Sequence, residues 1–246
     1  LAPSHYYARL TQRLIAAVSA PTAEGVLYEL DLRLRPSGNK GPVATHIDAF
    51  RKYQREEAWT WEHMALTRAR SIAGDKAFCD RVEAEVADIL ARPRDRTKVL
   101  ADAAEMRAVL AKEKPPRDIW DLKLIPGGQI DLEFIAQCAR LTGAILPDVW
   151  PPTSTGDALA RLDAGFCAAQ VRDELVAAYE LYLTLTQSVR LCLTGPLDAA
   201  DVPPGLADLL LRSTDLPDLS VLEAHIRETA GRVEAHFQAL VGGGEG

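Results

Sequence analysis

The feature of this sequence that most limits its fold is a strict two-residue alternation from Val26 to Arg35. One set of alternate positions is wholly apolar, and the other carries Glu29, Asp31, Arg33 and Arg35. Because side chains of a β-strand point alternately to opposite faces, this period predicts one strand with an apolar face and a charged face. This segment is the strongest strand signal in the sequence.

The rest of the chain has apolar residues at spacings of three and four, which are typical of helices. Helices are predicted at residues 3–19, 46–57, 60–74, 76–91, 97–113, 130–141, 155–164, 168–194 and 220–241, with a short one after Pro203-Pro204. A capping box formed by Ser220 and Glu223 would begin the last helix. Residues 121–124 are predicted to be extended. The predicted fold class is α+β, mostly α.

Composition excludes several classes of protein. The 246 residues carry a net charge of −7, which argues against non-specific nucleic-acid binding and against an anionic membrane surface as partner. The chain has no apolar run of the roughly 18 residues that span a bilayer and no secretory signal, so a cytoplasmic protein is expected. Its four cysteines are widely separated, which indicates reduced thiols used in packing.

Charge divides the chain unevenly. Residues 141–246 hold six basic and fifteen acidic side chains, whereas residues 1–75 hold ten basic and eight acidic ones. The sequence therefore predicts two domains, residues 1–142 and residues 143–246. The second is predicted to be an acidic antiparallel helical bundle.

The charged face of the predicted strand is a candidate nucleotide site. A carboxylate can help to hold Mg²⁺, while planar guanidiniums pair with phosphate oxygens, as a nucleoside triphosphate requires. The alternative is a solvated sheet face with cross-strand ion pairs, and the alternation alone favours that alternative.

A second candidate cluster runs from Asp121 and Lys123 to Gly127-Gly128. Two glycines before a helix can free its first N–H groups for an anion, and a nearby lysine adds positive charge. An ordinary turn is the commoner reason for such a glycine pair. Asp131 and Glu133, which follow, are also explained as acids in a first helical turn.

A third group joins aromatic and basic residues. Trp59, Trp61 and His63 precede Arg68 and Arg70, an arrangement that suggests a stacking platform, but Trp61 lies on an apolar stripe and is predicted to be a core residue. The five histidines show no metal-ligand spacing, and no G-x-S-x-G nucleophile motif is present.

Four segments together resemble the bacterial glutamine synthetase adenylyltransferase family, also called the adenylyl-removing enzyme. They are residues 25–38 (GVLYELDLRLRPSG), 53–63 (YQREEAWTWEH), 65–70 (ALTRAR) and 127–134 (GGQIDLEF). The resemblance is dense over residues 1–140 and looser beyond. The wording of the first two segments is similar to the C-terminal, adenylylating half of that family.

The resemblance implies a partial DNA-polymerase-β-like nucleotidyltransferase domain followed by a helical domain. The implied reaction moves AMP from ATP to a tyrosine of glutamine synthetase, with Mg²⁺ as cofactor and PII signal protein as a further partner. Asp31 matches the third metal-binding carboxylate, and Arg33 and Arg35 match two nucleotide-binding arginines. Lys123, Gly127 and Gly128 match a signature whose role is either structural or close to the nucleotide.

One departure from the family pattern limits this expectation. The family's first two carboxylates come from a G-S-x-x-D-x-D type motif, and this sequence contains no Gly-Ser pair and no D-x-D. We therefore expect the chain as given to be a truncated piece that binds Mg·ATP poorly and does not transfer AMP. Two alternatives stay open, a helical regulatory module (residues 143–246) that docks glutamine synthetase or PII protein, and the deadenylylating, phosphorolytic half.

Overall fold

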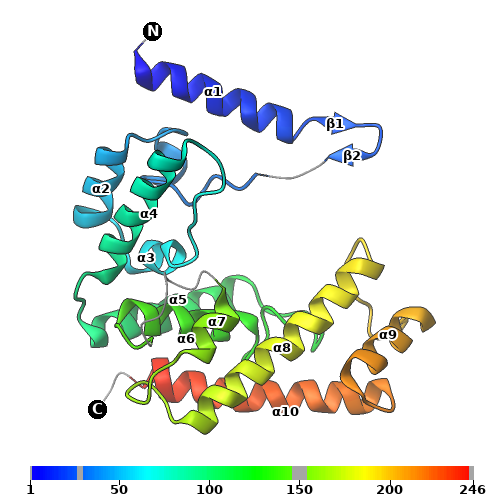
Figure 1. The fold of residues 1–246 in the computed structure, drawn as a ribbon. Coiled ribbons are helices and arrows are strands. Elements are labelled where there is room, and N and C mark those ends of the chain that lie inside the picture. The colour runs from blue at the N-terminus through cyan, green and yellow to red at the C-terminus, as the bar shows by residue number, and fades with distance from the viewer. Residues whose placement is uncertain (1, 27–29, 146–153, 244–246) are drawn as a thin grey trace. The chain divides into compact units, whose positions relative to one another are not determined.

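The structure, a computed structural model, describes residues 2–26, 30–145 and 154–243 (Figure 1). The chain separates into two compact units, Leu1–Arg92 and Pro93–Gly246. Each unit is described by itself.

The first unit is built from helices and one small hairpin. Its elements are α1 (Pro3–Val18), β1 (Pro21–Thr22), β2 (Gly25–Val26), the 3₁₀ turn η1 (Gly38–Lys40), α2 (Ile47–Glu56), α3 (Thr60–Leu66) and α4 (Lys76–Ala91). Helices α2 and α3 both pack on α4. The small core between them consists of Ile47, Met64, Val86, Ile89 and Leu90.

The long strand predicted for residues 26–35 is not formed in the described residues. Strand β2 ends at Val26 and pairs antiparallel with β1, with Thr22 opposite Gly25. Residues 30–35 have no regular secondary structure, and residues 27–29 lie outside the described residues. Alternation predicts which side chains share a face, but a strand also needs a neighbour to receive its backbone hydrogen bonds. No such neighbour for residues 30–35 occurs in the part of the chain that the structure describes.

The second unit is helical. Its elements are α5 (Arg96–Glu113), α6 (Gln129–Leu141), α7 (Thr155–Ala160), α8 (Ala169–Cys192), α9 (Pro204–Thr214), α10 (Leu219–Phe237) and the π-helical turn η2 (Gln238–Gly242). Helix α6 is its centre and packs against α5, α7, α8 and α10. Within α6, Leu132, Ile135, Cys138 and Ala139 are fully buried.

Three local predictions need correction. The helix predicted for residues 60–74 begins at Thr60 but already ends at Leu66. Residues 121–124 form a turn, with the Leu124 N–H donating to the Asp121 carbonyl at 2.9 Å, so they are not extended. Helix α10 is capped by Asp218, which accepts from the Val221 N–H. The predicted box fails because the Ser220 hydroxyl itself donates to Asp218.

The compact units do not coincide with the predicted domains. The boundary predicted between residues 142 and 143 falls inside the second unit, because α6 packs on helices from both sides of it. Whether the predicted domains fold independently stays a prediction. Among the described residues, no helix combines the length and the apolar character that crossing a membrane requires.

Candidate functional site

Asp31 and Arg33 form a close ion pair in the first unit. Arg33 Nη2 lies 2.6 Å from Asp31 Oδ2, and Arg33 Nε donates to both carboxylate oxygens at 3.0 and 3.1 Å. The backbone N–H of Arg33 also donates to Asp31 Oδ1 at 2.9 Å. Both side chains are exposed, by 55% for Asp31 and 74% for Arg33, so the pair is open to an incoming ligand.

This pairing fixes the charge of the carboxylate. The hydrogen bonds from the Arg33 side chain and backbone hold the pKa of Asp31 at about 2, below its ordinary value. Asp31 is therefore an anion at neutral pH, the state in which a carboxylate binds a hard cation. A cation at this position would compete with Arg33 for the same oxygens.

Arg35 is held differently. Its Nη1 donates to the Leu32 carbonyl, and its Nε donates to the Gly41 carbonyl at 3.4 Å. These bonds tie the end of the alternating segment to the loop that follows. The structure thus places Asp31 and Arg33 in contact, whereas Arg35 donates hydrogen bonds to backbone carbonyl groups. Glu29, the other carboxylate of the predicted face, lies outside the described residues.

The second predicted cluster is a tight turn in the second unit. The N–H of Gly127 donates to Asp131 Oδ2 at 2.6 Å, and the N–H of Gly128 donates to the Ile125 carbonyl at 2.9 Å. The next two N–H groups also have backbone partners, Leu122 for Gln129 and Lys123 for Ile130. The donors that a phosphate would use are thus occupied within the chain.

The glycines of this turn are required by space. Gly127 has φ +72°, and a Cβ there would lie 1.9 Å from the Ala230 carbonyl oxygen of α10. A Cβ on Gly128 would lie 2.5 Å from the Leu122 carbonyl oxygen. In addition, the buried Tyr182 hydroxyl of α8 donates to the Gly127 carbonyl at 3.1 Å. The turn thereby joins α6, α8 and α10.

Arg107 of α5 completes this arrangement, and the motif analysis did not single it out. Its guanidinium pairs with Asp131 through Nε and Nη2, and Nη2 also reaches the Ile125 carbonyl at 3.3 Å. Arg107 is 8% exposed and Asp131 is 3% exposed. The available signal was an arginine among the alanines of α5 (Ala103, Ala104, Ala108 and Ala111).

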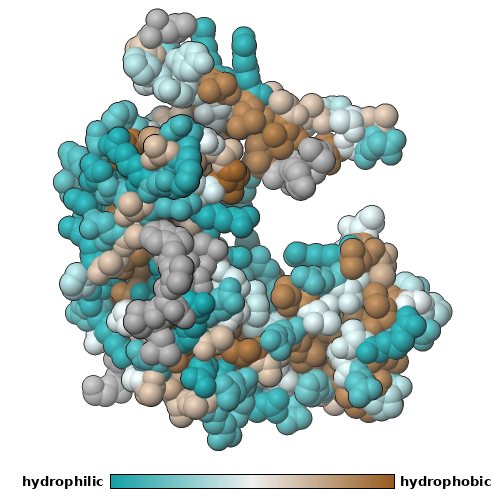
Figure 2. Space-filling view, viewed as in Figure 1, coloured by the Kyte–Doolittle hydropathy of each residue, from teal (hydrophilic) through white to brown (hydrophobic). Residues whose placement is uncertain are grey.

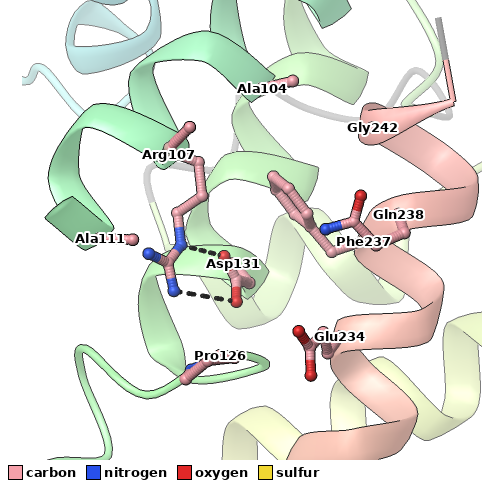
Figure 3. Close-up of a pocket in the computed structure, with 10 residues that line it drawn as sticks. Ala104, Arg107, Ala111, Pro126, Asp131, Glu234, Phe237, Gln238 and Gly242 are labelled. Atoms are coloured by element: carbon pink, nitrogen blue, oxygen red, sulfur yellow. Dashed lines mark hydrogen bonds and ion pairs between the residues drawn. The ribbon is translucent and has the colours of Figure 1, made fainter. Parts of the chain in front are cut away.

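A hollow of about 290 Å³ lies beside this buried pair (Figure 3). Arg107 and Asp131 line it, together with Glu234 and Phe237 from α10 and Gln238 from η2. Both oxygens of Asp131 are already paired, with Arg107 and with the Gly127 N–H. The ion pair that lines the hollow therefore has its carboxylate oxygens satisfied within the chain.

The aromatic cluster differs from its prediction. Trp61 is 39% exposed and Trp59 is 70% exposed, so Trp61 is not a core residue. Helix α3 ends after seven residues, and its buried side chain is Met64. Glu62 fixes the start of α3, because its carboxylate accepts hydrogen bonds from the Trp59 N–H at 2.9 Å and from the Tyr53 hydroxyl at 2.8 Å.

The remaining candidate sites are those for a metal ion and for a reactive thiol. Within residues 2–26, 30–145 and 154–243, no three His, Cys, Asp or Glu side chains gather closely enough to hold a metal ion. The four cysteines are unpaired. Burial raises the pKa of the Cys138 thiol to about 12, which makes it unreactive.

Known proteins are similar to this chain in sequence. Residues 1–85 match the family model described as glutamate-ammonia ligase adenylyltransferase. Almost the whole chain also aligns with proteins named bifunctional glutamine synthetase adenylyltransferase/adenylyl-removing enzyme. The one from Mesorhizobium japonicum is 66% identical over 99% of this chain, that from Rhizobium meliloti 54% over 98%, and that from Rhodopseudomonas palustris 44% over 98%.

The chain spans about a quarter of the length of these curated relatives. The family resemblance drawn from the motifs is therefore confirmed, and it extends over the helical second unit as well as over residues 1–85.

Proposed function

We propose that a protein containing this chain transfers AMP from ATP to a tyrosine of glutamine synthetase, and that Asp31 supplies one of its Mg²⁺ ligands. The observation that carries this proposal is the exposed, ionised Asp31 carboxylate paired with Arg33 inside the matched family domain. The relatives' name supports the reaction class. The sequence motifs favour the adenylylating half.

The described residues do not make a complete magnesium site. Among the described residues, no group of three His, Cys, Asp or Glu side chains gathers at Asp31, so we infer that the remaining ligands come from residues beyond the described ones. When bound, Mg²⁺ would neutralise triphosphate charge. The chain's own contribution is an anionic ligand at Asp31 and a guanidinium at Arg33, which can turn from Asp31 to a phosphate oxygen once a cation occupies that carboxylate.

Arg35 and the second cluster have separate proposed roles. We propose that Arg35, held on the Leu32 and Gly41 carbonyls, orders the end of the nucleotide segment. For Gly127 and Gly128 the occupied N–H groups favour the structural role over phosphate binding. Exposed Lys123 stays a predicted phosphate contact. Control by PII signal protein and a cytoplasmic location are also proposed, from the family resemblance.

The test is an Asp31→Asn variant of the full-length protein. We expect transfer of AMP to glutamine synthetase to fall by at least about 100-fold, because a metal ligand is lost without a change of shape. Asp80→Asn is the matched control, since Asp80 is another exposed carboxylate of the same unit paired with a cation, Lys76, at 2.8 Å. Unaltered transfer by Asp31→Asn would refute the role of Asp31. Phosphate-dependent release of AMP from modified glutamine synthetase, without transfer, would identify the deadenylylating half instead.

The isolated chain provides a second measurement. Titration calorimetry of the 246-residue chain with Mg·ATP is expected to give no binding at micromolar concentration, because most of the metal ligands are missing. Micromolar affinity would show that the described residues hold the nucleotide without further ligands.

The compactness of Pro93–Gly246 favours a second candidate function for the helical part. We propose that this unit is an interaction module, for which the acidic excess of residues 141–246 provides a charged surface. Capture of glutamine synthetase or PII protein by residues 93–246 tests it. If residues 93–246 retain neither protein, the remaining role for this unit is that of a scaffold.

A further inference from the structure

The hollow lined by α5, α10 and η2 has polar groups that form no hydrogen bond with the described residues. Figure 3 shows these side chains beside the buried pair of Arg107 and Asp131. The volume of about 290 Å³ is near the lower end of the range for small-molecule sites, roughly 300–1,000 Å³. All of its lining residues lie within Pro93–Gly246, so the hollow belongs to one compact unit.

Small side chains make the space for this hollow. Ala104, Ala108 and Ala111 line it at intervals of four and three residues, so they share one face of α5. Gly242 lines it from η2, where a Cβ would lie 2.3 Å from Gln238 Oε1. Because Gly242 has no side chain, the Gln238 amide can occupy its position beside the hollow.

Three side chains of the lining have polar atoms that a ligand can use. Arg107 is 8% exposed; its Nε and Nη2 bind Asp131, whereas its Nη1 makes no hydrogen bond to any described residue. The Glu234 carboxylate and the Gln238 amide likewise have no hydrogen-bond or ion-pair partner among the described residues. Since the polar groups of buried side chains are usually hydrogen-bonded, the unused Nη1 indicates a ligand that supplies an acceptor.

The hollow differs in this respect from the exposed hydrophobic surface of the first unit. Figure 2 shows hydrophobic residues along α1, of which Leu10 and Leu14 are 49% and 59% exposed. A hydrophobic stripe offers contact area but no polar group that selects a ligand. The hollow combines apolar walls with a few polar groups, which is the pattern of small-molecule sites.

The charges around the hollow favour a cation. Its lining carries one positive charge, on Arg107, and two negative charges, on Asp131 and Glu234. Phe237 adds an aromatic ring, whose face attracts cations. Residues 141–246 are acidic as a whole, with six basic and fifteen acidic side chains. This surrounding charge attracts a cation and repels an anion.

We propose that the hollow binds a small organic ammonium compound that also carries an uncharged oxygen acceptor. The Glu234 carboxylate holds the ammonium group, with the Gln238 amide oxygen and the Phe237 ring beside it. The oxygen accepts a hydrogen bond from Arg107 Nη1, and the carbon chain lies against the alanines of α5. The site does not depend on the proposed transfer of AMP, because none of its residues is assigned to that reaction.

Titration of the 246-residue chain with aminobutanol, followed by backbone amide NMR spectra, tests the ligand class. We expect saturable shifts, at concentrations up to about 10 mM, confined to the residues around the hollow. Butanediol and hydroxybutanoate replace the ammonium by a hydroxyl and by a carboxylate, and neither is expected to bind. Binding of either compound as tight as that of aminobutanol, or no saturable shift with aminobutanol, would overturn the proposal.

Butylamine, which lacks the hydroxyl, tests the contact with Arg107. We expect it to bind at least about threefold more weakly than aminobutanol, because it offers no acceptor to Nη1. Equal affinity of the two amines would refute this contact.

Two variants, each with a matched control, test the position of the site. Glu234→Gln is expected to weaken binding of aminobutanol at least about tenfold, because a hydrogen bond to a charged group is lost. Its control is Glu228→Gln, an exposed carboxylate of α10 that pairs with Arg232 outside the hollow. Ala108→Leu fills the hollow and is expected to abolish binding, whereas Ala101→Leu, exposed on the same helix outside the lining, is expected to retain it.

Unchanged amide signals of α8 in each variant show that the unit remains folded. Unaltered affinity in Glu234→Gln or in Ala108→Leu would show that the amine binds elsewhere and would refute the site. Loss of binding in a control variant as large as in its partner would refute it as well, because the effect would then not depend on the hollow.

Discussion

At the scale of single residues, Gly127 is the position where a side chain is least tolerated. It combines a positive φ with a close approach to α10, because a Cβ there would lie 1.9 Å from the Ala230 carbonyl oxygen. Gly143 has almost the same φ, +73°, but a Cβ there would meet nothing within 4 Å. A side chain at Gly143 would therefore cause backbone strain alone, whereas a side chain at Gly127 would add steric overlap with α10.

We predict that Gly127→Ala destabilises the chain by more than about 3 kcal/mol, because strain and overlap with α10 add. Gly143→Ala is expected to cost about 1 kcal/mol, from the left-handed backbone alone. Urea unfolding followed by circular dichroism measures both. Equal losses would show that α10 moves aside without cost and that the close approach at Gly127 is unimportant.

Arg107 and Asp131 form a buried pair in which each residue neutralises the other. We predict that Arg107→Met destabilises the chain by roughly 3–5 kcal/mol, because it leaves the Asp131 carboxylate buried without its cation. Adding Asp131→Asn should recover part of the loss, so the double variant is more stable than the sum of the single variants predicts.

The control for this pair is Lys98→Met on the same helix. Lys98 Nζ lies 3.1 Å from Asp102 in an exposed pair, so the expected cost is below about 0.5 kcal/mol. If Arg107→Met also lowered the free energy of unfolding by less than about 0.5 kcal/mol, the buried pair would contribute little to the stability of the fold.

At the scale of elements, α8 and α10 are joined by a titratable contact. His236 Nε2 lies 2.8 Å from Glu174 Oε2. The hydrogen bonds from His236 and Gln170 lower the pKa of Glu174 below its ordinary value. The stabilisation from this carboxylate is complete above the unfolded pKa of glutamate, about 4.3, and is lost as the pH falls through the lower folded pKa.

We therefore predict that Glu174→Gln lowers the free energy of unfolding at about pH 6 and that its difference from the unmodified chain shrinks below about pH 4. Glu180→Gln, at an exposed position of the same helix, is expected to have no such pH dependence. Urea unfolding across this range measures the differences. A constant difference for Glu174→Gln would show that the contact does not depend on the charge of Glu174.

Helices and the strand were predictable to different degrees. The bounds of α1, α2, α4, α5 and α8 follow from local periodicity and breakers such as Pro93, because a helix satisfies its hydrogen bonds within itself. The alternation from Val26 to Arg35 predicts a strand that residues 30–35 do not form, because strand formation depends on a partner that a local pattern does not contain. Trp61 illustrates a further limit, since a helical stripe is buried only where another element covers it.

The candidate sites show the same contrast. The contact between Asp31 and Arg33 could be anticipated, because residues two apart in an extended segment share a face. Arg107 and Asp131 are 24 residues apart, and their pairing depends on how α5 packs against α6. The close approach of Gly127 to Ala230 likewise depends on tertiary structure.

At the scale of the whole molecule, the uneven distribution of buried apolar side chains predicts unequal stability. Leu1–Arg92 has a small core, whereas Pro93–Gly246 contains most of the buried side chains. A unit with few buried contacts opens more often, and proteases cut the open state.

We predict that limited proteolysis of the 246-residue chain cuts first within residues 1–92 and leaves a resistant fragment that begins near residue 93. Mass spectrometry of the products identifies the cuts. Early cleavage in α6 or α8 would show instead that the second unit is the less stable one.

The π-helical turn at Gln238–Gly242 has a consequence for chain length. A π turn contains one residue more than an α turn, so deletion of a residue there converts it to an α turn and keeps both flanks in register. Deletion between Ala230 and Val233 would instead rotate every later residue by about 100° and remove Phe237 and Val241 from the core. A one-residue deletion is therefore expected to be tolerated at this turn but not within α10 before it.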